Sequence, residues 1–148
     1  MPGRPLLIVA GLLAFVLTGC SSEVELPEPG GSTGPMCNSV LQDAPQRVDN
    51  AEARETASGA GRAWGDPAII LQCGVPKPDA LKPTSRCAMV NGVGWFSKKT
   101  EDAYVFTTIG RETFVRVTVP REYEPTADAL VDLAKTIKNN VPVVRECV

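Results

Sequence analysis

Four cysteines are spread along the sequence with spacings that suit cross-linking better than metal binding: Cys37, Cys73, Cys87 and Cys147. No two of them form a C-x₂-C pair, so neither a zinc knuckle nor a thioredoxin-like redox pair is indicated. An even number of cysteines in a small exported domain is typical of disulfides. We therefore expect two disulfides and no bound metal.

The pairing of these four cysteines is not determined by their number, because three arrangements exist. The most economical one joins Cys73 to Cys87 around a proline-rich loop, and Cys37 to Cys147 near the two ends of the domain. In the chain-entropy model, closing loops of about 15 and about 100 residues stabilises a protein by roughly 3 to 5 kcal/mol each. We expect the economical pairing, with the alternatives open.

Histidine is absent from the sequence. The chain therefore lacks the usual general base near neutral pH, and it cannot by itself form a Ser-His-Asp or Cys-His catalytic site. We expect no enzymatic activity and no cofactor other than a covalent lipid. A hydrolase that uses a pair of carboxylates is the catalytic alternative.

Three residues, Trp64, Asp66 and Arg111, are candidates for contact with a ligand or partner. Trp64 and Asp66 offer an aromatic face and a carboxylate at a proline-containing turn. Arg111 lies between two predicted strands, where it could bind a carboxylate or phosphate through two hydrogen bonds. A small-ligand site requires the three to converge in one pocket. The structural alternatives, which we favour, are a packed Trp64, a turn-bonding Asp66, and an Arg111 that is solvated or pairs with Asp66 or Glu112.

The first twenty residues carry a targeting signal. Arg4 precedes an apolar run from Leu6 to Leu17, which has the length of a signal-peptide core and is short for a membrane span. The run ends in Leu17-Thr18-Gly19-Cys20, which resembles the lipobox of bacterial lipoproteins. This resemblance implies cleavage before Cys20 and a diacylglyceryl group, with palmitate-type chains, on its sulfur. An ordinary secretory signal with a chance cysteine is the alternative.

Three segments follow from these features: a signal peptide over 1–19, a lipidated cysteine with a flexible tether over 20–36, and a single domain over 37–148. The tether is rich in Ser, Gly, Pro and Glu, and has too few apolar residues to offset the entropy of ordering. Two acyl chains would hold the protein on the outer face of the cell membrane. A net charge of −2 without a dense basic stretch argues against nucleic acid as a partner. We expect a monomer.

The predicted helices lie at the two ends of the domain. Apolar residues recur with helical spacing over 37–44 and over 126–141. Between them, the polar stretch over 46–62 has little periodicity, which predicts a long surface loop with at most a brief strand at 47–48.

The predicted strands lie between the helices. The continuous apolar run over 68–74 indicates a buried strand. Asn91-Gly92 predicts a tight hairpin turn, and a second hairpin joins 103–109 to 113–119. The expected fold class is α+β: a small antiparallel sheet of about five strands with an N-terminal and a C-terminal helix packed on one face, held by two disulfides.

Several motifs together resemble an actinobacterial family of exported lipoproteins that is catalogued only as a domain of unknown function. They are Trp64-Gly65-Asp66-Pro67, Leu71-Gln72-Cys73-Gly74-Val75-Pro76, Pro83-Thr84-Ser85-Arg86-Cys87, Val90-Asn91-Gly92-Val93-Gly94-Trp95 and Thr107-Thr108-Ile109-Gly110-Arg111. The likeness extends from about Cys37 to Cys147. It implies an envelope location and four paired cysteines, and it supplies no substrate, cofactor or catalytic residue.

These features favour a non-catalytic, membrane-anchored envelope lipoprotein whose folded head binds another envelope component, either a protein or a glycan. A small-ligand or carbohydrate carrier is the first alternative. A carboxylate-based cell-wall hydrolase is the second.

Overall fold

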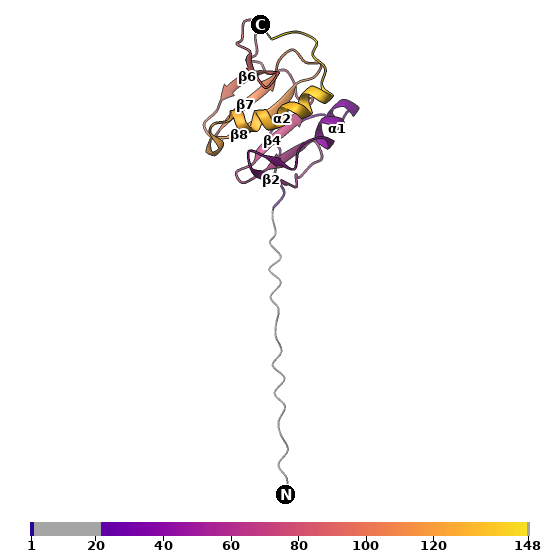
Figure 1. Ribbon diagram of the computed structural model, residues 1–148, viewed down its shortest axis with the longest axis vertical. Helices are drawn as coiled ribbons and strands as arrows, with labels where there is room; N and C mark the ends of the chain where they lie inside the picture. The colour runs from indigo at the N-terminus through magenta and orange to yellow at the C-terminus, as the bar shows by residue number, and fades with distance from the viewer. Residues whose placement is uncertain (2–21, 148) are drawn as a thin grey trace.

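The structure, a computed structural model, describes Met1 and residues 22–147. The predicted signal peptide and Cys20 lie outside the described residues. One antiparallel sheet with two helices on one face forms the domain (Figure 1). None of the helices in the described part of the chain has the length and apolar character needed to cross a membrane.

The sheet has eight strands in the order β1-β2-β3-β4-β8-β7-β6-β5. The strands are β1 (Arg47–Val48), β2 (Ala51–Arg54), β3 (Gly61–Trp64), β4 (Ile69–Cys73), β5 (Ala88–Val90), β6 (Val93–Lys99), β7 (Ala103–Thr108) and β8 (Val115–Pro120). Two meanders of four strands are thus joined where β4 pairs with β8. β1 and β5 form opposite edges of the sheet.

Two α-helices cover one face of the sheet, as the sequence predicts: α1 (Pro35–Gln42) and α2 (Ala127–Asn140). A short 3₁₀ helix, η1 (Arg121–Tyr123), precedes α2. The main core lies between the helices and the sheet, where Leu130, Leu133 and Ile137 of α2 are buried together with alternate residues of the strands. The predicted α+β class and helix positions are therefore confirmed.

The predicted hairpins are present. Asn91 and Gly92 have φ angles of 47° and 81°, which is the left-handed conformation that a tight turn between β5 and β6 requires. β7 and β8 form the second hairpin, with Ala103 opposite Pro120.

The expected strand count was too low, because the stretch over 46–62 is not a surface loop. β2 lies within this stretch and β3 begins in it. The two strands pair through Ala53–Trp64 and Arg54–Ala63. β2 has a mixed pattern of half-buried and exposed residues, so its sequence carries little alternation of apolar and polar residues. Its pairing with neighbouring strands, rather than its own composition, determines its structure.

The economical disulfide pairing is wrong. Cys37 bonds to Cys73, and Cys87 bonds to Cys147. The first bond joins α1 to the end of β4, and the second joins the start of β5 to the C-terminal segment. The proline-rich loop between Cys73 and Cys87 is therefore not closed on itself. Each of its ends is tied to a different terminal segment of the domain.

The segment expected to be a free tether packs on the sheet face opposite the helices. We call residues 24–32 the strap. Val24 pairs with Thr56 in a parallel bridge and is 9% exposed. Together with Leu26 it covers Ala63 and Ile70, in a second and smaller core. The expected flexibility of this segment is thus wrong for residues 24–32.

The strap is held in its central part by two polar side chains of the sheet. Gln72 is fully buried and donates to the Pro27 carbonyl at 3.0 Å. Arg116 donates to the carbonyls of Pro27 at 2.9 Å and Pro29 at 2.5 Å, and to Gln72 Oε1. Beyond them the Ser32 amide donates to the Cys73 carbonyl at 2.7 Å. The strap therefore crosses the sheet from β2 to β8 before the chain turns into α1.

Candidate functional site

A cleft of about 510 Å³ opens at the end of the domain that holds the C-terminus. Three segments form its walls: the proline-rich loop before β5, the turn between β7 and β8, and the C-terminal segment after α2. The lining residues are Lys77, Leu81, Lys82, Pro83, Ser85, Cys87, Ile109, Gly110, Arg111, Phe114, Val144, Arg145, Glu146 and Cys147. A volume of this size falls in the range of small-molecule and peptide side-chain sites.

The C-terminal wall of the cleft is held by the β7–β8 turn. The amides of Val144 and Arg145 both donate to the Gly110 carbonyl, at 2.8 and 3.0 Å, and the Glu112 amide donates to the Pro142 carbonyl. Gly110 has a φ of 73°, and a Cβ there would collide with the Arg145 carbonyl. Glycine is therefore required for this contact. The Cys87–Cys147 disulfide closes the far end of the wall.

The proline-rich wall is ordered by local hydrogen bonds. The Lys82 amide donates to Ser85 Oγ at 2.9 Å, and the Ser85 amide donates to the Lys82 carbonyl at 3.0 Å. Leu81 is 8% exposed and anchors the loop from inside. The two bonds fix the backbone on either side of Pro83.

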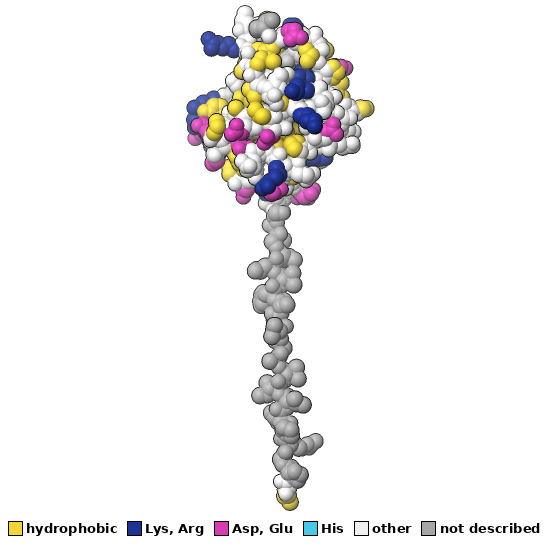
Figure 2. Space-filling model, in the orientation of Figure 1, with side chains coloured by type: hydrophobic (Ala, Val, Ile, Leu, Met, Phe, Trp, Pro, Cys, Tyr) yellow, Lys and Arg dark blue, Asp and Glu magenta, His cyan; other side chains and the backbone are white. Residues whose placement is uncertain are grey.

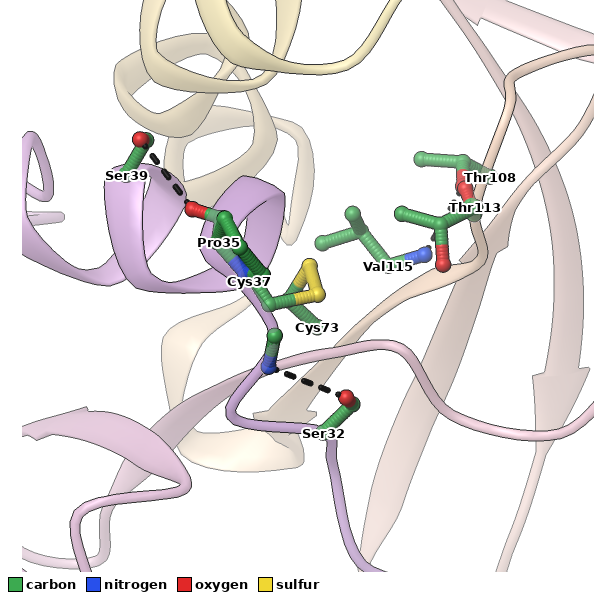
Figure 3. The surroundings of a disulfide bond; sticks show 9 residues. Ser32, Pro35, Cys37, Ser39, Cys73, Thr108, Thr113 and Val115 are labelled. Carbon is green, nitrogen blue, oxygen red and sulfur yellow. Dashed lines mark hydrogen bonds between the residues drawn. A yellow bond between two sulfur atoms is a disulfide. The ribbon is translucent and has the colours of Figure 1, made fainter.

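The turn between β7 and β8 is shaped by Thr108. Its hydroxyl donates to the Thr113 carbonyl at 3.4 Å and accepts from the Val115 amide at 2.9 Å. Figure 3 shows these residues beside the Cys37–Cys73 disulfide. Both cysteines of that bond are buried. The base of the turn that lines the cleft is thus held by these two hydrogen bonds.

Positive charge predominates around the cleft. Lys77, Lys82 and Arg145 have exposed side chains in its walls, and Glu146 is the carboxylate among the lining residues that the structure describes. None of the three cations forms an ion pair within residues 22–147, where the ion pairs are Arg47–Glu52 and Arg54–Asp66. A Lys or Arg side chain projects from this end in Figure 2. The chain as a whole carries a charge of −2, so the sign of the charge at the cleft is opposite to that of the whole chain.

Arg111 lies in the wall of the cleft, but its guanidinium forms hydrogen bonds to backbone carbonyls within the fold. It is 9% exposed and donates to the Val141 carbonyl at 2.5 Å and to the Gly92 carbonyl at 3.1 Å. Burial lowers its pKa. Its predicted partners Asp66 and Glu112 do not pair with it in the described structure. Arg111 therefore links the end of α2 to the β5–β6 turn.

Trp64 and Asp66 lie away from the cleft. Trp64 is fully buried and its indole N–H donates to the Pro45 carbonyl at 2.9 Å. Asp66 lies in the β3–β4 turn with a side chain that is 91% exposed, and an oxygen 3.7 Å from Arg54 Nη1. The structural role that we favoured for Trp64 is the observed one.

The three candidate residues do not converge. The β3–β4 turn lies beside the Pro120 end of β8, because Ile70 pairs with Thr118. Arg111 precedes β8 at its other end. A ligand site built from Trp64, Asp66 and Arg111 is therefore wrong. No cluster of three or more His, Cys, Asp or Glu side chains that could hold a metal ion occurs among the described residues.

Sequence reasoning missed the cations of the cleft. Lys77 and Lys82 lie in the proline-rich loop, which we considered only as a loop that a disulfide would close, and Arg145 lies 63 residues beyond Lys82. The prolines themselves were an available signal, because they restrict the backbone of a long loop, and long loops between regular elements are a common place for a binding site. The proximity of Arg145 to Lys77 and Lys82 depends on the Cys87–Cys147 bond.

Comparison with protein families gives a match over most of the chain. A family model described as "Protein of unknown function (DUF3515)" matches residues 5–145. No curated protein and no solved structure matches the chain. Because the family model covers nearly the whole sequence, this chain belongs to the DUF3515 family of proteins of unknown function.

Proposed function

We propose that this chain is an exported lipoprotein, anchored by a lipid on Cys20 at the outer face of the cell membrane, and that its head binds an acidic segment of another envelope protein. The role is one of binding and not of catalysis. The cleft carries this proposal, because its cations lack carboxylate partners within the described residues. Two disulfides in a domain of this size agree with an oxidising compartment.

The walls of the cleft favour a peptide with both acidic and aliphatic side chains. Val144 is 64% exposed at its rim, and Leu81 and Phe114 line it. Lys77, Lys82 and Arg145 would meet carboxylates at the same surface. Charge complementarity of this kind directs association and selects the partner.

The same surface is less suited to binding a glycan. Both tryptophans are buried, Trp64 at 0% and Trp95 at 1% exposure, so neither offers an open ring face to a sugar. An anionic small ligand is the second candidate, and the volume of about 510 Å³ is the observation in its favour.

Titration of the oxidised protein with a capped peptide of alternating Glu and Leu, followed by NMR, tests the proposal. We expect shifts at cleft residues, and weaker binding at high salt, because exposed charges are screened. A peptide with Gln in place of Glu should bind at least about tenfold more weakly, which corresponds to about 1.4 kcal/mol.

Charge reversal locates the site. Lys77→Glu with Lys82→Glu should lower affinity by about tenfold or more, since each rim charge contributes up to about 1 kcal/mol. Lys98→Glu with Lys135→Glu is the matched control, because these lysines are exposed and lie outside the cleft. Equal losses in the two variants, or no binding of the acidic peptide beside clear binding of an anionic glycan, would reject the peptide proposal.

A further inference from the structure

We infer that the strap holds the head against the membrane surface, with the β2 side of the sheet nearest the lipid and the cleft directed away from it. This inference rests on the proposed anchor at Cys20. It concerns the bilayer as a partner of the domain, and it defines which surface of the head is free to meet another envelope protein.

The strap leaves little free chain between the anchor and the domain. The Ser22 carbonyl already accepts a hydrogen bond from Arg54 Nη2 at 2.9 Å. Val24 is the first buried residue in the described segment 22–147. Val24 also accepts a bond from the Ala57 amide and donates one to the Glu55 carbonyl. The four-residue step from position 20 to Val24 has a fully extended length of at most about 14 Å.

The docking of the strap is built into the sheet. Val24 and Leu26 pack on Ala63 and Ile70, and the buried Gln72 side chain bonds to the strap backbone. Arg116 donates four further bonds in the same place, two to carbonyls of the strap and two to Gln72 Oε1. Releasing the strap would exchange these bonds for bonds to water and expose the apolar side chains of the second core, which costs free energy.

The strand order separates the attachment point from the cleft. The strap enters beside the β2–β3 loop, whereas the cleft ends at Cys87, immediately before β5. From β2, the near wall of the cleft at Phe114, beside β8, is three strand spacings away, about 14 Å, and the far wall at Cys87, beside β5, is six spacings away, about 29 Å. In Figure 1 the label β2 lies at one end of the domain, and β6 and the C-terminus lie at the other. A head held at the β2 side therefore turns the cleft outward.

The distribution of charge on the head would by itself favour the opposite orientation. The inferred orientation therefore depends on the strap and not on electrostatic attraction to the membrane. Glu23, Glu25 and Glu55 are exposed near the attachment point. An anionic bilayer repels these carboxylates and attracts the cations of the cleft within roughly 10 Å of its surface. On a long free tether the head would turn its cleft toward the lipid. The short strap prevents this and leaves the cations available to a ligand.

The test places a fluorophore by amber suppression at Ala57, beside the strap, or at Thr84, in the exposed proline-rich loop. The full chain is produced in a host that exports it, and is reconstituted in vesicles of phosphatidylglycerol and phosphatidylethanolamine with a short-range quencher on the headgroups. We expect most of the fluorescence at position 57 to be lost and most of that at position 84 to remain. Equal quenching at the two positions would overturn the inference.

Two altered chains test the cause of the orientation. An insertion of about 20 Gly and Ser residues between Ser21 and Ser22 adds a linker with a span of about 25 Å and leaves every strap contact in place. Val24→Asp with Leu26→Asp releases the strap instead. Both should abolish the difference between the two positions and increase quenching at position 84. A difference that persists in the insertion variant would overturn the inference even if the released variant fails to fold.

A second arm separates this inference from the anchor itself. A chain that begins at Cys20 keeps every contact of residues 22–147, and its one cysteine outside the two disulfides is Cys20. It can be coupled through that thiol to maleimide lipids in the same vesicles. Unequal quenching in the coupled chain supports the orientation even where mass spectrometry finds no lipid on the full chain, a result that would reject the anchor alone.

Discussion

Arg111, which is buried, and Arg116, which is half-buried, bind backbone carbonyls where a carboxylate is the more familiar partner. Arg111 joins the Val141 and Gly92 carbonyls, and Arg116 joins those of Pro27 and Pro29. Burial lowers the pKa of both, and for Arg116 the nearby Glu28 acts in the opposite direction. The planar guanidinium has five N–H donors, so one side chain can link two segments that are distant in sequence.

Replacing Arg111 with Met should lower the free energy of unfolding by about 2 to 3 kcal/mol, because the Val141 and Gly92 carbonyls lose a charged donor. Urea denaturation measures the change. Arg86→Met is the control, since Arg86 is exposed and should change stability by less than about 0.5 kcal/mol. An Arg111→Met protein as stable as the control would show that the two bonds contribute nothing.

Asp49 makes stability depend on pH. Burial raises its pKa, and the charges of Asp128 and Asp132 raise it further. A carboxyl whose pKa is higher in the folded protein contributes stability that is present below the unfolded pKa of about 3.9 and is lost as pH rises through the folded value.

Asp49→Asn should therefore stabilise the protein at neutral pH, by about 0.5 kcal/mol, and have little effect near pH 3. Asn also tolerates the φ of 47° at this position. Thermal melts across pH 3 to 7 measure the difference, with Asp79→Asn in the exposed loop as control. A neutral-pH effect equal to that of the control, or a gain that is largest at pH 3, would contradict the assigned cause.

At the scale of elements, the two disulfides differ in burial and in the segments that they join. Cys37–Cys73 is buried between α1 and β4, whereas Cys87–Cys147 has half-buried cysteines and forms part of the cleft. Their sequence separations are 36 and 60 residues. The chain-entropy model gives each a stabilisation of about 4 kcal/mol.

Cys87→Ser with Cys147→Ser should lower the free energy of unfolding by about 4 kcal/mol and should also weaken binding of the acidic peptide, because the C-terminal wall loses its attachment. Cys37→Ser with Cys73→Ser should destabilise at least as much, since it places two hydroxyls in the core. Urea titration and NMR provide the two measurements. A non-reducing peptide map should recover the pairs 37–73 and 87–147; a map with the pair 73–87 would refute this arrangement.

At the scale of the whole molecule, the proposed anchor and the inferred orientation would act together. The lipid alone would hold the protein at the membrane, and the strap would determine which surface faces outward. An acidic partner would then meet a cleft that is held away from the competing anionic lipids.

Cys20→Ser should move the protein from the membrane fraction to the soluble exported fraction, because two acyl chains are needed for stable attachment. Immunoblots of fractions from the exporting host measure this, and mass spectrometry of the wild-type protein should find an N-terminal Cys20 that carries a diacylglyceryl group. Pro83→Ala, in the cleft loop, is the control and should stay in the membrane fraction. An unmodified residue 20 in membrane-extracted protein would reject the anchor.

The sequence by itself determined the local features of this protein. The helical spacing that predicts α2, the Asn91-Gly92 turn and the apolar run of β4 are properties of adjacent residues, so each could be recognised without the fold. The presence of disulfides also followed from the number of cysteines. The alternation of Val24 and Leu26 with Glu23 and Glu25 was a period-two signal for the strap, but the surrounding Pro, Gly and Ser residues obscured it.

Only the tertiary structure decided which distant segments meet. Contacts between distant segments determine the disulfide pairing and the pairing of β2 with β3. They also determine the hydrogen bonds of Arg116 to the strap and the position of Lys77, Lys82 and Arg145 around one cleft. Such contacts are selected by the burial and hydrogen bonding of the whole fold, and no local propensity encodes them. Arg111 illustrates this: its sequence position suggested a ligand contact, and its two backbone partners lie 19 and 30 residues away.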